Sequence, residues 1–223
     1  MFCLNDVPCV EGDASVARRS APWRALDAAE RVAAAGGLLF LSPFLLTVGV
    51  ATAVLSRNSP LIAHRRLGAG GNPFWVLKFR TMWSRGARPR WRPGLIEHIE
   101  DETGPHEKCA RDARISSRFA RFCRRHSIDE LPQLLHVVRG EMSLVGPRPI
   151  TASEWRLHYQ HASDVLDVKP GLSGLWQIMG RNRLSYEQRR ELDLALARNH
   201  SLKLYFQILL WTLPEIWNGR NAW

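Results

Sequence analysis

Lysine is scarce in this sequence of 223 residues, since it occurs only at positions 78, 108, 169 and 203 among 31 lysines and arginines. Arginine therefore carries most of the formal net charge of +10. A positive excess of this size suits nucleic acid, an anionic membrane surface or a phosphorylated substrate. Arginine binds phosphate and carboxylate through its planar guanidinium, although codon bias in a GC-rich genome would also enrich it.

Cysteine is also rare, and its four positions (3, 9, 109 and 123) form neither a CxxC pair nor a zinc-finger spacing. We interpret them as reduced cytosolic thiols. Residues 1–24 mix acids with arginines and contain no apolar signal-peptide core. We therefore expect no secretory processing, and we predict that this segment is a flexible tail. No recognised DNA- or RNA-binding motif occurs, so no nucleic-acid partner is expected.

Charge is absent between Arg31 and Arg57, and this predicts a membrane segment over residues 25–57. As one straight helix, residues 32–56 would reach ~37 Å, which is enough to cross a bilayer. The central helix of a soluble fold is the alternative interpretation.

The centre and the flanks of this segment favour a re-entrant helix over a simple span. Ser42-Pro43 lies near the middle, where proline removes a backbone hydrogen bond and kinks a helix. Both flanks are rich in arginine, and a helix that enters, breaks and returns keeps both on the cytoplasmic side. The freed backbone groups would need partners such as the Ser42 hydroxyl.

The remaining residues, 58–223, are expected to form one catalytic domain. Its pattern predicts a mainly helical α+β fold with a β-hairpin, an irregular excursion over 84–110 and amphipathic helices at the membrane interface. The hairpin strands are predicted at 61–67 and 74–80. Helices are predicted at 117–126, 131–138, 151–164, 185–198 and 201–217.

Residues 127–133, Ser-Ile-Asp-Glu-Leu-Pro-Gln, hold the pattern that is most informative about chemistry. Ser127 and Glu130 have the spacing of a capping box, which is the structural interpretation. Pro132 favours a helix that starts nearer Leu131, with Asp129 and Glu130 at its mouth. There one carboxylate could attack phosphorus while the other holds a divalent cation.

Two further patterns place cations where phosphate could bind. Pro147 and Pro149 restrict the backbone around Arg148 and would present its guanidinium with little loss of entropy, unless the segment is only a rigid surface loop. Lys78 and Arg80 would share one face of a strand, unless they are only the exposed charges of an edge strand.

A glycine-rich turn over 169–174 precedes Gln177 and the pair Gly180-Arg181. Glycine allows a backbone to approach a ligand closely, but it also simply makes turns.

Taken together, these segments resemble the bacterial sugar transferase family, the monotopic phosphoglycosyl transferases that start surface glycan assembly. The matching pieces run in the family's order over about residues 22–220, and their ordered combination is specific. They are Ser42-Pro43, 66–68, 78–82, 112–115, 127–133, 142–149, 169–174, Gly180-Arg181 and 193–212.

The resemblance implies a reaction in which Asp129 attacks the β-phosphate of a UDP-sugar and expels UMP. Polyprenyl (undecaprenyl) phosphate would then take the sugar-phosphate from Asp129, while Glu130, together with Asp129, helps to bind Mg²⁺. The enzyme would lie on the cytoplasmic face of a bacterial inner membrane, in an oligomeric state left open. Candidate substrate and phosphate contacts are Lys78, Arg80, Arg124, Arg148, Gln177 and Arg181. The alternative is a non-catalytic membrane-surface protein that binds anionic lipid or a partner enzyme.

The sequence departs from the family pattern away from Asp129, Glu130 and Arg148. His136 and Glu141 stand where asparagine and aspartate are usual, and Leu196 and Tyr205 replace a late tyrosine and a late aspartate. In addition, Ser116 and Ser173 replace a frequent threonine, and the stretch 116–121 is one residue longer than usual.

Overall fold

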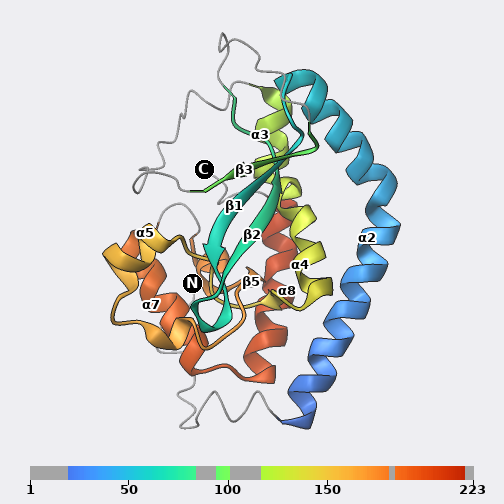
Figure 1. The fold of residues 1–223 in the computed structure, drawn as a ribbon. Coiled ribbons are helices and arrows are strands. Elements are labelled where there is room, and N and C mark those ends of the chain that lie inside the picture. The colour runs from blue at the N-terminus through green and yellow to red at the C-terminus, as the bar shows by residue number, and fades with distance from the viewer. Residues whose placement is uncertain (1–19, 84–93, 101–116, 181–183, 219–223) are drawn as a thin grey trace.

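A computed structural model describes residues 20–83, 94–100, 117–180 and 184–218, and it has the predicted mixed, mainly helical α+β architecture (Figure 1). Its elements are α2 (Ala21–Ser56), β1 (Leu61–Leu67), η2 (Ala69–Gly71), β2 (Pro73–Phe79), β3 (Ile96–Ile99), α3 (Arg118–Arg125), η3 (Ile128–Gln133), α4 (Leu134–Arg139), β4 (Ser143–Val145), α5 (Ala152–Glu154), η4 (Trp155–Tyr159), η5 (Ser163–Val165), β5 (Gly171–Ser173), α6 (Leu175–Met179), α7 (Tyr186–Arg198) and α8 (Leu202–Asn218).

Helix α2 is continuous through Pro43, and its 36 residues give a length of about 54 Å. Proline has no N–H, so the carbonyl of Leu39 loses its helical partner. The Ser42 hydroxyl donates to that carbonyl at 2.7 Å, and the Thr47 hydroxyl donates to the carbonyl of Pro43 at 2.9 Å. The helix curves along one side of the molecule without a break (Figure 1), so its re-entrant course stays a prediction.

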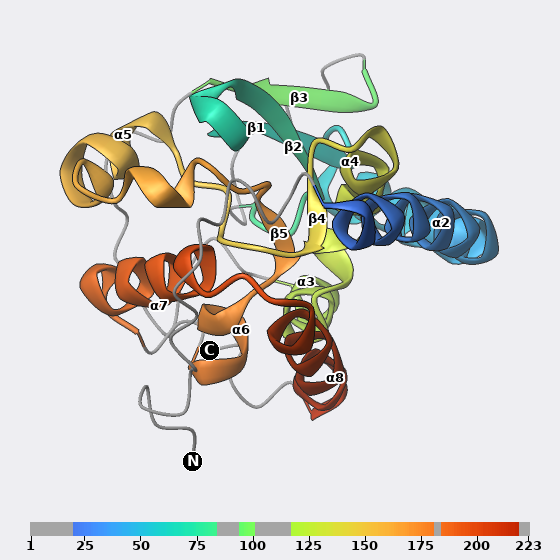
Figure 2. The ribbon, with the colours of Figure 1, turned by 90° about the horizontal axis from the view of Figure 1, so that it is seen from below.

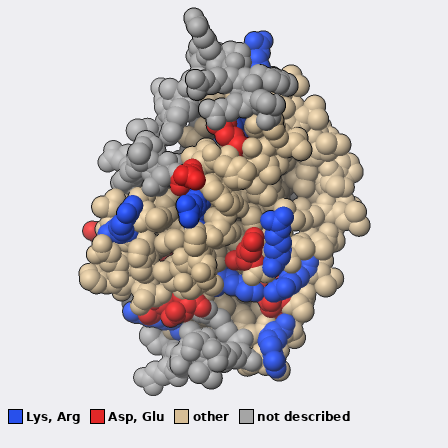
Figure 3. Space-filling model, viewed as in Figure 1, with Lys and Arg blue, Asp and Glu red and all other residues tan. Residues whose placement is uncertain are grey.

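Most of the apolar side chains of α2 have no protein to pack against. Leu39 is 78% exposed and Phe40 is 84% exposed, and Val32, Leu46 and Val54 are similarly open. The helix is long and apolar enough to cross a membrane. In Figure 3 the right-hand side of the molecule is tan over the middle of α2, without a Lys, Arg, Asp or Glu side chain there. An apolar surface of this extent indicates a membrane-associated helix.

The first turns of α2 pack on the rest of the fold instead. Glu30 is only 5% exposed, and its Oε1 accepts hydrogen bonds from the Ser143 hydroxyl at 2.8 Å, from the Leu144 N–H at 3.0 Å and from the Tyr205 hydroxyl. Trp23 stacks on His200 with 4.3 Å between ring centroids. The membrane-associated part of α2 therefore follows a docked segment that begins at Ala21.

The predicted hairpin is confirmed: β1 and β2 pair antiparallel, with Leu61 opposite Phe79 and Leu67 opposite Pro73. The irregular excursion predicted for 84–110 is wrong at β3, which pairs parallel with β1 and completes a sheet of order β2-β1-β3. Four residues are too few for their alternation to stand out in the sequence.

A second, smaller sheet holds the two segments around the candidate site. Strands β4 and β5 pair parallel, with Ser143 opposite Gly171 and Val145 opposite Ser173. In Figure 2 this pair lies between the three-stranded sheet and helices α6, α7 and α8.

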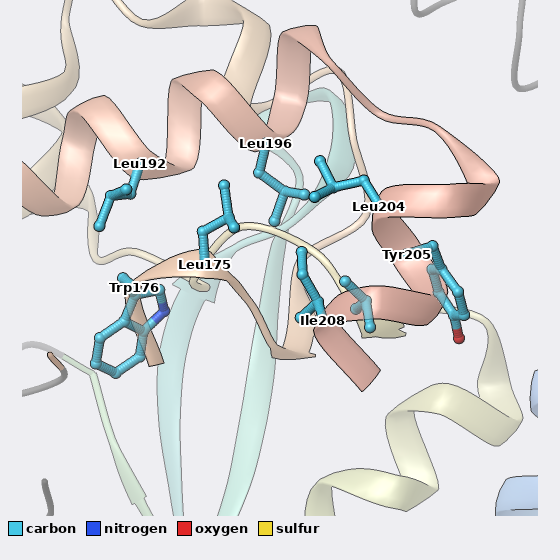
Figure 4. Packing of buried hydrophobic residues seen from close by; sticks show 8 residues of the cluster. Leu175, Trp176, Leu192, Leu196, Leu204, Tyr205 and Ile208 are labelled. Carbon is cyan, nitrogen blue, oxygen red and sulfur yellow. The ribbon is translucent and has the colours of Figure 1, made fainter. Parts of the chain in front are cut away.

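The largest core cluster joins α6, α7 and α8. Leu175, Leu192, Leu196, Leu204 and Ile208 are buried against one another (Figure 4). Leu196, which replaces a tyrosine of the family pattern, is fully buried here and makes only apolar contacts within this cluster. The predicted helices 185–198 and 201–217 are confirmed as α7 and α8.

Candidate active site

Asp129 and Glu130 lie in the first turn of η3, between α3 and α4. The capping-box interpretation of this segment is wrong, because the Ser127 side chain makes no capping hydrogen bond and its backbone is left-handed, at φ 55°. Glu130 N–H donates to the Ser127 carbonyl at 3.1 Å instead. The chain therefore turns sharply at Ser127, which buries Asp129 and leaves Glu130 partly exposed beside it.

Asp129 is 8% exposed, and burial raises its pKa to about 6. The neighbouring charge of Glu130 raises the pKa further, whereas the charges of Lys78 and Arg124 lower it. A carboxyl group with this pKa is largely ionised at pH 7, and few solvating contacts surround it. As an anion, such a group has the chemistry of a nucleophile.

Lys78 reaches the acid pair from β2. Its Nζ donates to Glu130 Oε1 at 2.7 Å. Lys78 and Glu97 are both in register with Ile62, so their side chains leave the sheet on the same face. Arg80 lies on this face too, as predicted, where it pairs with Glu97 and donates to the Ser59 carbonyl at 2.8 Å. The structure thus joins Lys78 to the acid pair and Arg80 to β3.

Arg124 approaches from α3, the helix predicted over 117–126. It donates to the Thr81 hydroxyl at 3.5 Å, and its charge reaches Asp129. Asp129 therefore lies between cations from two separate elements.

Arg148 follows β4 and is held by its backbone, because its N–H donates to Asp193 Oδ1 at 3.2 Å. Its guanidinium carbon lies 5.1 Å from the centroid of Trp176. Burial alone would lower the pKa of Arg148, but the carboxylates of Glu154 and Glu130 outweigh burial and raise it. Its buried Nε has no hydrogen-bond partner in the described part of the chain.

Arg189 was not predicted from the sequence, because it lies in a charge-rich helix of the kind that is usually solvated. It is 6% exposed, and its guanidinium carbon lies 5.7 Å from the centroid of Trp176. Its Nε is also buried without a partner among the described residues. Burial and the charge of Arg148 lower its pKa. Two buried guanidinium groups beside one indole make a region that favours an anion.

Asp193, on α7, is hydrogen-bonded to the loop that carries Arg148. Burial raises its pKa to about 7, while its hydrogen bonds from the Arg148 N–H and the Tyr159 hydroxyl, the latter at 2.9 Å, lower it. The Asp193 carboxylate therefore holds the backbone of Arg148 in place.

The glycines of 169–174 allow close contact between backbone segments. A Cβ at Gly171 would lie 2.0 Å from the Gly146 nitrogen, so β5 and the loop that carries Arg148 can touch only without a side chain there. Gln177 donates to the Leu172 carbonyl at 2.8 Å, and its buried Oε1 has no partner in the described ranges. Arg181 lies outside the described residues.

Two departures from the family pattern meet next to Lys78. His136 Nδ1 lies 2.6 Å from Glu141 Oε2, and its Nε2 accepts a hydrogen bond from the Leu77 N–H at 3.1 Å. Because Nε2 accepts, the proton must lie on Nδ1 and be donated to Glu141. This chain of contacts anchors β2 one residue before Lys78.

Asp129 and Glu130 could supply only part of the ligands that a magnesium ion needs. In the described ranges no three His, Cys, Asp or Glu side chains gather as a metal cage. Asp129 and Glu130 are adjacent carboxylates, and Mg²⁺ is commonly bound by one or two carboxylates together with substrate phosphates. The donor set therefore suits an ion that arrives with a phosphorylated substrate.

Fold and site together define a membrane-associated protein in which two adjacent acids, one of them buried, lie among cationic side chains. The profile of the family described as "Bacterial sugar transferase" matches residues 23–219. The chain is 38% identical over 197 residues to "Exopolysaccharide production protein ExoY" of Rhizobium meliloti, covering 86% of this chain and 85% of that protein.

Longer proteins match as well. The identity is 35% over 176 residues with "Undecaprenyl-phosphate galactose phosphotransferase" of Salmonella typhimurium, covering 73% of this chain and 34% of that protein. It is 32% over 203 residues with "UDP-glucose:undecaprenyl-phosphate glucose-1-phosphate transferase" of Xanthomonas campestris, covering 87% and 39%. The chain belongs to the bacterial sugar transferase family.

Proposed function

We propose that this protein transfers a sugar-1-phosphate from a UDP-sugar to polyprenyl (undecaprenyl) phosphate, as the first step of exopolysaccharide or surface glycan assembly. The transfer takes place on the cytoplasmic face of the bacterial inner membrane. The observation that carries the proposal is Asp129, a buried carboxylate beside Lys78 and Arg124 in a domain docked on an apolar helix. The names of the Salmonella and Xanthomonas relatives support the acceptor and the reaction class.

In the first step, an Asp129 oxygen forms a bond to the β-phosphorus of the UDP-sugar. The anhydride bond between the β-phosphorus and the bridging oxygen breaks, and UMP leaves with that oxygen and the electron pair. Asp129 now carries the sugar-phosphate as an acyl phosphate. Burial among cations keeps the carboxylate poorly solvated and oriented for this attack.

In the second step, an oxygen of the lipid phosphate attacks the phosphorus on Asp129. The bond between phosphorus and the carboxylate oxygen breaks, which frees Asp129 and yields polyprenyl diphosphate-sugar. Atoms and charge balance without a redox partner or added water.

Cations around the acid pair neutralise the phosphates in both steps. Lys78 and Arg124 act close to Asp129, and Arg148 with Arg189 favours the anionic part of the nucleotide. Glu130 and Asp129 would hold Mg²⁺, which supplies charge screening for the diphosphate when bound. Glu130 also fixes Lys78.

The test is UMP release by purified protein with Mg²⁺ and polyprenyl phosphate across a panel of UDP-sugars. We expect release with at least one sugar and its loss in Asp129→Asn, because an amide cannot act as the nucleophile. Asp164→Asn is the matched control, since Asp164 pairs with Arg198 on the surface and should leave release unchanged. Turnover by Asp129→Asn at the parent rate would overturn the mechanism.

A further inference from the structure

A buried histidine connects the strand that carries Lys78 to the segment that carries the acid pair. His136, on α4, is 2% exposed, and its Nε2 accepts a hydrogen bond from the Leu77 N–H at 3.1 Å. Helix α4 begins directly after η3, which holds Asp129 and Glu130. The Lys78 ammonium joins the same strand to η3 when it donates to Glu130 at 2.7 Å, but both of those side chains are 29% exposed. Strand β2 is therefore held to η3 and α4 by one buried contact and by one that is open to solvent.

We propose that His136, with Glu141 as its partner, is a positioning residue that keeps Lys78 in place for the phosphate groups of the donor. The inference rests on the proposed function and adds to it the group that holds β2 during the reaction. In that reaction the Lys78 ammonium is shared between Glu130 and phosphate, which weakens its own hold on η3. The buried contact of His136 does not change when the donor binds. Both His136 and Glu141 depart from the family pattern, so the proposed role concerns this chain.

The backbone pairing of β2 is the first argument. Within the described residues β2 is an edge strand, because the order of the sheet is β2-β1-β3. The Arg80 N–H donates to the Pro60 carbonyl at 2.8 Å, and hydrogen-bonded pairs recur at every second residue of an antiparallel ladder. Lys78 therefore belongs to a hydrogen-bonded pair with Ile62 of β1, whereas the N–H of Leu77 points away from β1. The imidazole thus lies on the open edge of the strand, one residue before Lys78, and β2 is held from both sides.

The protonation of the imidazole is the second argument. The chain reverses at Gly140, whose φ of 77° is left-handed, and the Glu141 N–H donates to the His136 carbonyl at 2.9 Å. This reversal brings Glu141 Oε2 to 2.6 Å from His136 Nδ1. A neutral imidazole carries one proton, so a proton that the carboxylate holds at Nδ1 leaves Nε2 free to accept from the strand. Glu141 therefore selects the tautomer on which the contact with Leu77 depends.

Two substitutions at His136 separate its hydrogen bond from its volume. Glutamine can place an amide oxygen near the position of Nε2 and accept from the Leu77 N–H, whereas methionine has a similar length and no comparable acceptor. His136→Gln therefore keeps the contact, and His136→Met removes it. Tyr205→Phe is the control for lost stability, because it removes a buried hydrogen bond that joins α8 to α2 and not β2 to α4.

Glu141→Ala tests the same contact with little change to the core, because the Glu141 side chain is 40% exposed. Without the carboxylate the proton can lie on either ring nitrogen of His136, so only part of the population accepts from Leu77. We expect the same effects as in His136→Met, but smaller.

The experiment measures two quantities for the parent and these four variants in lipid nanodiscs. The first is the burst of UMP from a UDP-sugar without acceptor, as its maximal rate and the half-saturating concentration of the sugar nucleotide. The burst reports attack by Asp129. The second is the hydrogen-exchange rate of the Leu77 amide in the absence of substrate, which reports the contact with His136 directly and does not depend on activity.

His136→Met should lower the maximal burst rate about tenfold, because a displaced cation loses stabilisation of the transition state, and should change the half-saturating concentration much less. Its Leu77 amide should exchange faster. His136→Gln should return both quantities to within about twofold of the parent, since it restores the acceptor. Tyr205→Phe should behave as the parent does.

A parent-like burst in His136→Met with fast exchange at Leu77 would overturn the positioning role, as would a burst in His136→Gln as slow as in His136→Met. Unchanged Leu77 exchange in His136→Met would overturn the contact itself, and parent-like behaviour of Glu141→Ala would overturn the part assigned to Glu141. An equally slow burst in Tyr205→Phe would assign the effect to stability alone. A parent without a burst would instead contradict the proposed function, which the exchange of the Leu77 amide does not report.

Discussion

At Asp129 two requirements oppose each other, namely burial and ionisation of the side chain. The fold buries a carboxylate that must be ionised to act, and burial raises its pKa from 3.8 to about 6. Lys78 and Arg124 recover part of the cost of that burial. A buried charge of this kind reduces the free energy of unfolding, and such a cost is typical of groups that serve chemistry, as the proposed function requires of Asp129.

This opposition predicts how stability depends on pH. Between about pH 4 and pH 6 the folded protein still holds the Asp129 proton while the unfolded chain has released it, so stability falls as pH rises through this window. The rise of the Asp129 pKa from 3.8 to about 6 corresponds to about 3 kcal/mol. Asp129→Asn cannot ionise, so at pH 8 its free energy of unfolding should exceed that of the parent by about 3 kcal/mol, and the difference should vanish near pH 4. Denaturant titrations at both pH values measure this, and a constant difference would refute the assigned burial.

Helix α2 is buried against the protein in its first turns and exposed in its middle. Its first turns end in the hydrogen-bonded Glu30 and the buried Ala34, whereas its middle exposes Leu39 and Phe40. Tyr205, which replaces an aspartate of the family pattern, donates to Glu30 and so joins α8 to α2. The membrane-associated part of the helix is therefore rigidly attached to the domain that carries the acids.

This attachment makes Glu30 a strong determinant of stability. Glu30→Ala would leave the Ser143 hydroxyl, the Leu144 N–H and the Tyr205 hydroxyl buried without their shared acceptor, at a cost of about 3 kcal/mol or more. Tyr205→Phe removes one of the three hydrogen bonds and should cost about 1 kcal/mol. Thermal unfolding in detergent measures both, with the exposed Glu191→Ala as control. Equal melting temperatures for Glu30→Ala and Glu191→Ala would contradict this account of the attachment.

Elements that depend on local chemistry could be predicted from the sequence, and those that depend on distant partners could not. The hairpin has turn residues between two strand patterns, and α3 has Ser117 as its N-cap, so both were predicted. Strands β4 and β5 have three residues each and form only because distant segments meet, and they were missed. Asp129, Glu130 and Lys78 were predicted and do meet. Arg189 and Glu30 were missed, since burial of a charge in a helix leaves no local signal.

At the scale of the whole molecule, the proposed reaction requires a water-soluble donor and a membrane-bound acceptor to meet at one place. The apolar α2 runs along one side of the molecule (Figure 1), and the acid pair lies in the first turn of η3, between α3 and α4. Arg148, in the loop after β4, and Arg189, on α7, lie beside Trp176 and would bind the nucleotide in the proposed reaction. In this arrangement the sugar-phosphate needs to travel only from one phosphate site to the other by way of Asp129.

The most direct test of the central claim is the intact mass of the protein after incubation with a turnover-competent UDP-sugar and Mg²⁺, without lipid acceptor. The account predicts a mass increase equal to one sugar-phosphate that is lost on addition of polyprenyl phosphate and never appears in Asp129→Asn. Product formation by the parent with no such adduct at any time, or an adduct of the same mass on Asp129→Asn, would contradict the role of Asp129 as nucleophile.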